Sequence, residues 1–381
     1  MLHLRTKKLA YFVMVSHSFG LTAAVYNYNR RSALLNEFMV KLFGLPAMSY
    51  YDDKFGFEPE DSVDHAHSAV QSVHRWLGAK FDDAKCQKGE KVEILGVEYD
   101  LNEMMLRIKP KRKEEIVAWI DKILKEEKLD PGEAGKLKGV LMFAASQIWG
   151  KVGRAFMRAL SERQYDKSGE NKLTLAIKAA LLTWRSLVLS GPPRPILDLE
   201  EQPADVVIFT DGFWPDDSSE EKPRVGAAVF IRSEGKGFYF SLEVPDEIME
   251  EWMPRATQIV MIELLAPIVA NECFRKDLEG AKVLLFVGSE AVEGALVKGY
   301  PSKDDLCWLT SVFWDQALKL KALFYIDRVA TDANPGDGPS RGRDREARAC
   351  RWKWTRSYFP EVVIEGLGKF TLKMVDLPLG T

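Results

Sequence analysis

A proline-rich break divides the chain into two parts whose sequence patterns differ. The segment 191–195 (GPPRP) combines the two residue types that most strongly interrupt regular structure, so it predicts a linker. Before it, residues 110–190 place apolar side chains at helical spacing. After it, short apolar runs of strand length alternate with helical segments, as is typical of a mixed α/β layer. The break therefore predicts a multidomain α+β chain.

The part after the break predicts a mixed five-stranded sheet. Its apolar runs are short and rich in branched and aromatic residues, which favours strands, and longer segments between the later runs have helical spacing. The expected strands are 205–211, 225–231, 238–244, 282–287 and 323–329, and the expected helices are 258–274 and 304–318.

The part before the break predicts a hairpin followed by helices. Residues 92–107 alternate apolar and polar side chains on both sides of a turn at 100–102. Pro110 is suited to the first turn of a helix. Further helices are expected at about 133–161 and 171–189.

Length and charge bound the classes of protein that fit. A chain of 381 residues has room for two or three domains. The net charge of −3 conceals an asymmetry, because residues 105–165 carry 14 Lys and Arg against 8 Asp and Glu, whereas residues 201–381 carry 22 against 30. A basic segment of this kind is compatible with binding nucleic acid.

The chain shows no signal for export or for membrane insertion. No apolar run approaches the roughly 20 residues that a membrane span needs, and no signal peptide is recognisable. The four cysteines lie far apart and form no CxxC pair, so neither a zinc cluster nor a disulfide framework is expected. We therefore expect an intracellular protein, cytoplasmic or nuclear, with no membrane partner.

The pair Asp52-Asp53 is the first candidate site. It follows Tyr50-Tyr51 and lies between apolar neighbours, which favours a tight turn that presents two carboxylates. Hard divalent cations prefer such oxygen ligands, and two-metal phosphoryl transfer uses them. The alternative for two adjacent acids is a solvated turn with no bound ion.

The surroundings of this pair resemble the palm of a reverse transcriptase. The Phe-Gly-Leu segment at 19–21 is similar to the family's template- and nucleotide-facing element, Tyr-Tyr-Asp-Asp to its metal-binding turn, and Leu-Gly-Val at 95–97 to its primer grip. The resemblance is strongest to retroelement polymerases of the DIRS-type, tyrosine-recombinase group, within the DNA/RNA polymerase superfamily. Residues 136–160 resemble their thumb, and the likeness extends from about residue 16 to about residue 345.

One departure from that family concerns its first active site. The family's palm has a further metal-binding Asp on a strand before the Phe-Gly-Leu element. Residues 1–51 contain no Asp, and their only acid is Glu37. The resemblance therefore implies a truncated palm without fingers, and autonomous polymerisation is not expected.

Three further acids occupy positions that suit a second metal site. Asp211 ends the first expected strand after the break, Glu263 lies within an apolar helix, and Asp337 begins the last helical region. A carboxylate at the edge of an apolar core is costly unless it is paired or binds a metal. The alternatives are a strand-end turn for Asp211 and a helix N-cap for Asp337.

The order of these acids resembles ribonuclease H. The resemblance implies an RNase H-like domain in which Asp211, Glu263 and Asp337 bind Mg²⁺ or Mn²⁺ and cut the RNA of an RNA–DNA hybrid. That family has another Asp at the end of the fourth strand, and Gly288 stands at this position. Because glycine supplies neither ligand nor charge, we expect weak or lost cleavage.

Basic residues form the third candidate feature. Cations at spacings of 3, 4 and 7 place Lys151, Arg154 and Arg158 on one face of the expected helix. Such a face can follow a phosphate backbone without reading its sequence, and the alternative is a solvated charged surface. The expected nucleic-acid contacts are Lys109, Lys111, Arg112, Lys113, Lys136, Lys138, Lys151, Arg154, Arg158 and Arg341.

These features combine into one hypothesis with an alternative. The chain is expected to be a retroelement-derived reverse transcriptase and RNase H fragment, in which Asp52, Asp53, Asp211, Glu263 and Asp337 are the remaining catalytic and metal-binding residues. The alternative is a catalytically dead module that binds nucleic acid. The expected domains are a partial palm at 1–108, a helical thumb or connection with its linker at 109–200, an α/β RNase H-like domain at 201–348, and a tail at 349–381.

Overall fold

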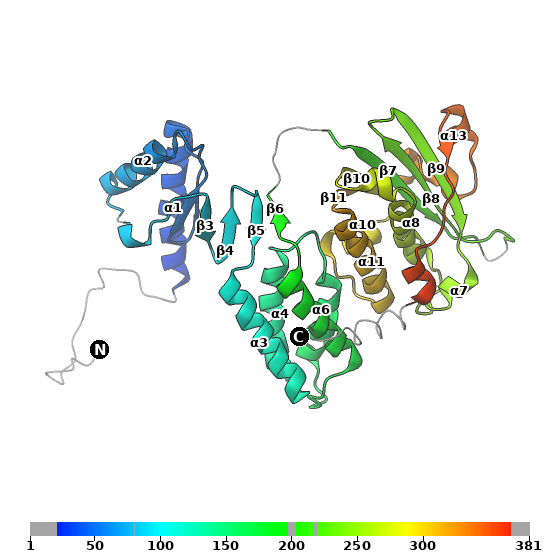
Figure 1. Cartoon of the computed structure of the whole chain (residues 1–381), viewed down its shortest axis with the longest axis horizontal. Coiled ribbons are helices and arrows are strands. Elements are labelled where there is room, and N and C mark those ends of the chain that lie inside the picture. Colours follow the sequence, from blue (N-terminus) through cyan, green and yellow to red (C-terminus); the bar gives the residue numbers. More distant parts are fainter. Residues whose placement is uncertain (1–20, 80, 197–202, 217–218, 367–381) are drawn as a thin grey trace. The chain divides into compact units, whose positions relative to one another are not determined.

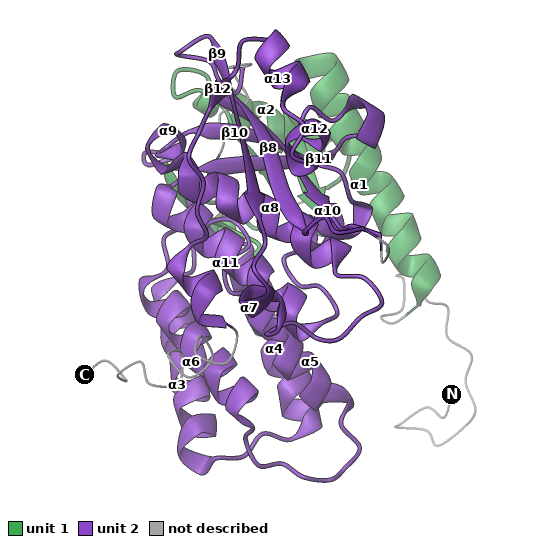
Figure 2. Cartoon of the chain, turned by 90° about the vertical axis from the view of Figure 1, so that its right-hand side faces the viewer, with its two compact units in different colours: residues 1–96 green, residues 97–381 purple. Residues whose placement is uncertain are grey.

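The computed structural model describes residues 21–79, 81–196, 203–216 and 219–366. The chain divides into two compact units, Met1–Gly96 and Val97–Thr381, shown in different colours in Figure 2. The Phe-Gly part of the Phe-Gly-Leu segment lies outside the described residues. The expected boundary between palm and thumb at 108 lies inside the second unit.

The described residues of the first unit form two α-helices and a short hairpin. In α1, Leu35 and Met39 are buried, and Gly44 ends the helix in the left-handed conformation, where its N–H donates to the carbonyl of Val40. Strands β1 and β2 pair Tyr50 with Asp53, which leaves Tyr51 and Asp52 as a two-residue turn. The elements are α1 (Thr22–Phe43), β1 (Ala47–Tyr50), β2 (Asp53–Gly56), α2 (Val63–Trp76), the 3₁₀ turn η1 (Asp83–Lys85) and β3 (Lys91–Ile94).

The second unit begins with the expected hairpin and a group of helices. Strands β4 and β5 pair antiparallel, and the helices enclose an apolar core that includes Ile120, Leu141 and Trp184. Asp130 caps one helix by accepting a hydrogen bond from the N–H of Glu133. The elements are β4 (Val97–Asp100), β5 (Met105–Arg107), α3 (Pro110–Glu126), α4 (Pro131–Ala145), η2 (Arg154–Phe156), α5 (Met157–Tyr165) and α6 (Leu175–Ser190). Figure 1 labels β4, β5, α3, α4 and α6.

The helix expected at 133–161 is interrupted, which corrects that prediction. Helix α4 ends at Ala145, and α5 begins at Met157 after a turn and the 3₁₀ turn η2. Gly150 and Gly153 lie in this gap with φ of 58° and 80°, in the left-handed region that breaks a right-handed helix. Lys151, Arg154 and Arg158 therefore do not share one continuous helix.

Part of the proline-rich segment forms an edge strand that is packed against its neighbours, although the sequence predicted a linker. Arg194 and Pro195 form β6, which pairs antiparallel with β5 through Leu106 and Met105. The N–H of Trp149 donates to the carbonyl of Pro192 at 3.1 Å, and Ile148 bridges Pro193. Residues 192–195 are thus fixed to the end of α4 and to β5.

The rest of the second unit is built on a mixed sheet that has six strands, not the expected five. The order is β11-β10-β7-β8-β9-β12; β7, β8 and β9 are antiparallel neighbours, while β10 runs parallel to both β7 and β11. The sixth strand is a two-residue edge that pairs parallel with β9. The strands are β7 (Val206–Phe213), β8 (Arg224–Ile231), β9 (Lys236–Glu243), β10 (Lys282–Val287), β11 (Leu323–Arg328) and β12 (Lys353–Trp354).

Helices lie against both faces of this sheet, and two glycines allow them to approach closely. A Cβ at Gly212 would be 2.7 Å from the backbone N of Glu263, and a Cβ at Gly226 would be 2.2 Å from that of Ser340. Since Gly226 pairs with Asp211, the residue before Gly212, the two glycines point to opposite faces. The helices are α7 (Asp246–Met249), α8 (Ile259–Cys273), α9 (Arg275–Leu278), α10 (Glu290–Lys298), α11 (Asp304–Leu320), η3 (Thr331–Ala333), α12 (Asp337–Ser340) and α13 (Arg345–Ala349).

Residues beyond the expected domain end at 348 also join this packing. Strand β12 extends the sheet, and Val363, which is buried, belongs to the same apolar core as Ile208 and Phe313. Within the described residues, no helix is both long enough and apolar enough to cross a bilayer. The four cysteines, all of them described, are free thiols.

Candidate functional site

The centre of the candidate site is Asp211, near the carboxyl end of the middle strand β7. Its side chain is only 6% exposed, although a carboxylate is normally solvated. The hydroxyl of Ser340, from α12, donates to Asp211 Oδ2 at 2.7 Å. A charge-assisted hydrogen bond from α12 therefore helps to hold this acid inside the fold.

Gly288 lies directly beside Asp211, at the end of β10. A Cβ at Gly288 would be 2.9 Å from Asp211 Oδ1 and 4.0 Å from Glu263 Oε1, so the two acids meet around this glycine. The same Cβ would be 3.7 Å from Asn334 Nδ2. The carboxylate of Asp211 thus fills space next to position 288, and any side chain there would have to displace it.

Glu263 reaches this point from α8. It is half-buried between fully buried neighbours, Ile262 and Leu264, which confirms the expected carboxylate at the edge of an apolar core. The apolar residues of α8 pack on β7 and orient the helix. The backbone of α8 passes close to Gly212 at Glu263. The sequence prediction that Asp211 and Glu263 converge agrees with this geometry.

Burial changes the protonation of both acids. Burial raises the pKa of Asp211 to about 6; the hydrogen bond from Ser340 and the charge of Arg341 oppose this rise, and Asp337 adds to it. Burial, with a smaller contribution from the charge of Asp211, raises the pKa of Glu263 to about 7, and a hydrogen bond with Ser289 opposes it. The pair therefore takes up and releases protons close to neutral pH.

Asp337 belongs to the same neighbourhood but is already paired. Arg341 Nε donates to Asp337 Oδ1 at 2.9 Å, and the Arg341 guanidinium also lies 5.3 Å from the centre of the Phe213 ring. This arginine was predicted to contact nucleic acid, and in the structure part of its charge is neutralised within α12.

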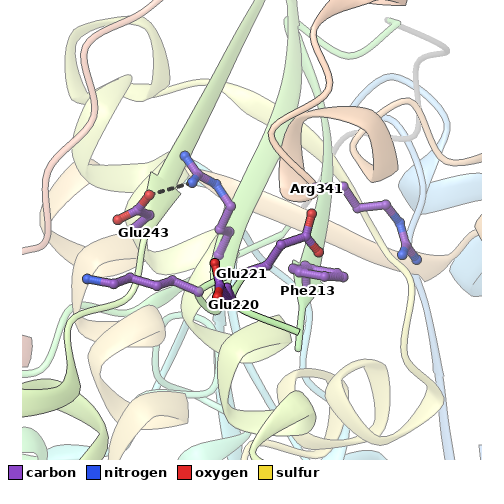
Figure 3. A pocket seen from close by; sticks show the side chains of 7 residues that line it. Phe213, Glu220, Glu221, Glu243 and Arg341 are labelled. Atoms are coloured by element: carbon purple, nitrogen blue, oxygen red, sulfur yellow. Dashed lines mark hydrogen bonds and ion pairs between the residues drawn. The ribbon is translucent and has the colours of Figure 1, made fainter. Parts of the chain in front are cut away.

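A cavity of about 280 Å³ opens beside Arg341. Figure 3 shows its walls, which include Phe213, Glu221 and the ion pair in which Arg224 Nη1 donates to Glu243 Oε1 at 2.7 Å across β8 and β9. Its lining is charged and carries both signs. It is therefore suited to water and small polar groups rather than to an apolar ligand.

The donors at this site do not fit the expected Mg²⁺ or Mn²⁺ centre as they are arranged. Within the described residues, no group of three or more His, Cys, Asp or Glu side chains is placed to hold a metal ion. One oxygen of Asp211 accepts from Ser340, one oxygen of Asp337 accepts from Arg341, and Gly288 offers no ligand. The geometry therefore supports a proton-binding carboxyl pair and carries no metal-dependent step.

Sequence reasoning missed the polar residues that hold the acids in place. Ser340 is fully buried and Asn334 is 6% exposed; the Asn334 amide donates to the carbonyl of Thr210 at 3.1 Å and accepts from the N–H of Gly336 at 2.9 Å. A small polar residue three positions after a candidate acid, as Ser340 is after Asp337, is the only signal the sequence offers.

Asp52 and Asp53 lie in the first unit, in the expected hairpin turn. Both are exposed, and Tyr51 beside them has a φ of 51°. Within the described residues they are part of no group of three metal-binding side chains. The turn is confirmed, and the metal-binding role of the two acids stays a prediction.

The expected nucleic-acid residues differ in how free their charges are. Arg158 Nη2 pairs with Glu162 at 2.6 Å, and its guanidinium also contacts Asp304. Arg112 pairs with Glu115 at 2.9 Å, and Lys138 Nζ donates to Gln164 at 3.2 Å. Lys111 and Lys136 are exposed, Lys113 is half-buried on α3, and Lys109 precedes that helix.

Comparison with known proteins gives a weak structural likeness. No protein-family description and no curated protein matches the chain. Among solved structures, the chain is similar to the crystal structure of RNase H1 from the halophilic archaeon Halobacterium salinarum NRC-1, with 19% sequence identity and a TM-score of 0.27. The match covers 35% of this chain and 92% of the RNase H1 chain.

Proposed function

We propose that residues 201–348 form an RNase H-like domain that binds RNA–DNA hybrids and whose cleavage activity is weak or lost. Three antiparallel strands followed by alternating helices and parallel strands support the fold assignment. Acids that come from the first strand, the first long helix and a late helical turn support the relation to the nuclease. The retroelement origin, with a partial palm before residue 108 and a thumb at 109–200, rests on the sequence resemblance.

The observation that carries this proposal is the position of Gly288 between Asp211 and Glu263. A two-metal nuclease needs several carboxylates whose charges are balanced by cations. Here Asp211, Glu263 and Asp337 lack the further carboxylate, and burial raises the pKa of Asp211 and of Glu263. With one carboxylate fewer, the site is expected to bind Mg²⁺ or Mn²⁺, the cations proposed for any residual activity, less tightly.

A cleavage assay tests the loss of activity. The purified chain is incubated with a labelled RNA–DNA hybrid and Mg²⁺ or Mn²⁺, and little or no cleavage is expected. Robust cleavage that Asp211→Asn abolishes would overturn the proposal.

The role of Gly288 is tested by Gly288→Asp, with Gly288→Asn as a control of the same shape and no added charge. Either side chain must displace the Asp211 carboxylate, because a Cβ there lies 2.9 Å from Asp211 Oδ1. Metal-dependent cleavage in Gly288→Asp that exceeds that of Gly288→Asn supports the assignment. Equal rates in the two variants contradict it.

The second candidate function is a catalytically dead module that binds nucleic acid. The hydrogen bonds that occupy Asp211 and Asp337 favour it, because they use carboxylate oxygens that a nuclease would keep for cations. It predicts hybrid binding that weakens with salt and no cleavage, even in Gly288→Asp. Absence of hybrid binding in the wild-type chain would contradict both candidates.

A further inference from the structure

Three cationic side chains gather beside the end of α4. Lys151 lies in the turn after that helix, Arg154 begins η2, and Arg194 belongs to β6. The N–H of Arg194 donates to the carbonyl of Gln147 at 3.1 Å, and its Nη1 donates to the carbonyl of Ser146 at 3.4 Å. These bonds to the end of α4 bring an arginine that is distant in the sequence next to the other two cations.

None of these three cations has an acidic partner within the described part of the chain. The neighbouring Arg158 shows the usual arrangement, since it contacts both Glu162 and Asp304. By contrast, the hydrogen bonds that Arg154 and Arg194 make go to backbone carbonyls, and Arg154 Nε is buried without any partner. Among the described residues, no acid therefore compensates the charges of the cluster.

The cluster is also half-buried, which makes its repulsion significant. Burial, together with the charges of Arg154 and Arg194, lowers the pKa of Lys151 to about 8. Burial and the charge of Arg194 likewise lower the pKa of Arg154. Like charges in a partly desolvated site repel one another, and a bound anion offsets this repulsion.

One side of the cluster is bounded by the residues after α10. Gly299 has a φ of 79°, and a Cβ there would be 2.9 Å from Lys151 Cβ and 3.1 Å from Arg154 Cβ. Arg154 Nη1 donates to the carbonyl of Lys298 at 3.4 Å. Tyr300, the residue after Gly299, is 44% exposed and interacts electrostatically with Arg154. An accessible aromatic ring thus lies next to the uncompensated charges.

We propose that Lys151, Arg154 and Arg194 form a binding site for the backbone phosphates of a nucleic acid strand, with the Tyr300 ring available to an adjacent sugar or base. Guanidinium groups match phosphate oxygens in a planar, two-pronged geometry, and lysine adds a compact charge. Aromatic rings beside a cationic groove are a recurrent platform for single bases. This inference rests on the proposed function and assigns the site that supplies part of the hybrid affinity.

Equilibrium binding of a fluorescent RNA–DNA hybrid, measured by anisotropy over a range of salt concentrations, tests the site. The variant Lys151→Gln/Arg154→Gln/Arg194→Gln is expected to weaken binding about tenfold or more and to reduce the salt slope by about 2 to 3. The control Lys236→Gln/Lys276→Gln/Lys319→Gln removes three charges from exposed lysines on β9, α9 and α11 and should bind like the wild type.

Two single variants keep the test interpretable if the triple variant does not fold. No hydrogen bond or ion pair of the Lys151 side chain is found among the described residues, so Lys151→Gln should keep the fold and still weaken binding, whereas Lys151→Arg should retain it. Thermal unfolding of each variant checks the fold. Wild-type affinity and salt slope in a folded Lys151→Gln and a folded triple variant would overturn the site and leave the proposed function standing.

If the wild-type chain binds no hybrid, the proposed function fails and a second measurement decides the site. Inorganic pyrophosphate is then titrated by calorimetry into the wild-type chain and the folded variants. Binding to the wild type that is lost in Lys151→Gln supports a phosphate site. No binding, or equal binding in both, overturns it.

Discussion

The chain carries two groups of carboxylates that its sequence suggests for the same kind of chemistry, and they lie in contrasting surroundings. Asp52 and Asp53 are adjacent in sequence and exposed in a turn of the first unit. Asp211 and Glu263 come from separate elements and meet inside the second unit, around Gly288. Adjacency in sequence thus gave a solvated pair, whereas long-range packing gave a buried one.

The contrast teaches that burial, more than the number of acids, determines how a carboxyl group responds to its surroundings. Burial raises the pKa of Asp211 and of Glu263 into the physiological range. Ser340 donates to Asp211, and the backbones of α8 and α12 approach the sheet closely at Gly212 and Gly226. Changes in this region should therefore affect stability, while changes in the exposed turn should not.

The largest effect is expected from Gly226→Ala, which tests the close packing around the buried pair. A Cβ there would meet the backbone of Ser340 at 2.2 Å, so α12 must move away from β8. We expect a loss of about 3–4 kcal/mol in the free energy of unfolding, measured in urea. Gly139→Ala, on α4 with nothing within 4 Å of the new Cβ, serves as control and should change stability by about 1 kcal/mol or less. Equal stability of both variants would refute the close approach of α12.

The next effect is expected from Ser340→Ala, which removes the hydrogen bond to Asp211. The ionised carboxylate would lose its charge-assisted donor while it stays buried, at a cost of about 1–3 kcal/mol. Because the hydroxyl favours the charged form, the loss should be larger at pH 8 than at pH 5. Chemical unfolding of both proteins at the two pH values measures it. A loss that does not depend on pH would mean that the hydroxyl acts only through packing.

A smaller effect on the free energy of unfolding, in the stabilising direction at high pH, is expected from Glu263→Gln. The folded protein holds the Glu263 proton up to a pKa of about 7, above the ordinary value of 4.5, so this group's contribution to stability is complete below pH 4.5 and is lost as pH rises through 7. The neutral variant lacks this loss and should exceed the wild type by about 1–2 kcal/mol at pH 8, with little difference at pH 4.5. Unfolding curves at both values measure it, and a variant that is less stable than the wild type at pH 8 would contradict the assigned burial.

The smallest effect is expected from Asp52→Asn/Asp53→Asn. Both side chains are exposed, and exposed substitutions usually change stability by less than about 0.5 kcal/mol. Thermal unfolding of this variant should superimpose on that of the wild type. A change as large as that of Ser340→Ala would show that the turn is packed against something, and it would remove the contrast between the two carboxylate groups.

Much of the sheet could be predicted because its strands carry local patterns. The five expected strands correspond to β7 to β11, and their ends agree within two residues. They could be predicted because buried strands are short apolar runs in any context. Strand β12 has two residues and depends on the edge of β9, so it has no pattern of its own. The break after α4 was missed because its apolar spacing continues, although Gly150 and Gly153 marked it.

The candidate site was predictable in its acids and not in their surroundings. Asp211 and Glu263 were identified by residue type and position, and both meet at Gly288. Ser340 became visible only through the fold, because its contact with Asp211 joins residues that are distant in the sequence. The prediction that Lys151, Arg154 and Arg158 share one helix face was wrong for the same reason. Strand β6 brings Arg194 next to Lys151 and Arg154, while Glu162 and Asp304 neutralise Arg158.

The strand β6 also bears on how the chain folds during synthesis. Because Pro195 pairs with Met105, the strand that closes the helical region lies before the first strand of the six-stranded sheet. A ribosome therefore releases β4, β5 and α3 to α6, with the segment that closes them, before β7 emerges. Domains generally fold as units in the order of their synthesis. The helical region can thus complete its own apolar core first, and it is then a folded neighbour for the sheet that follows.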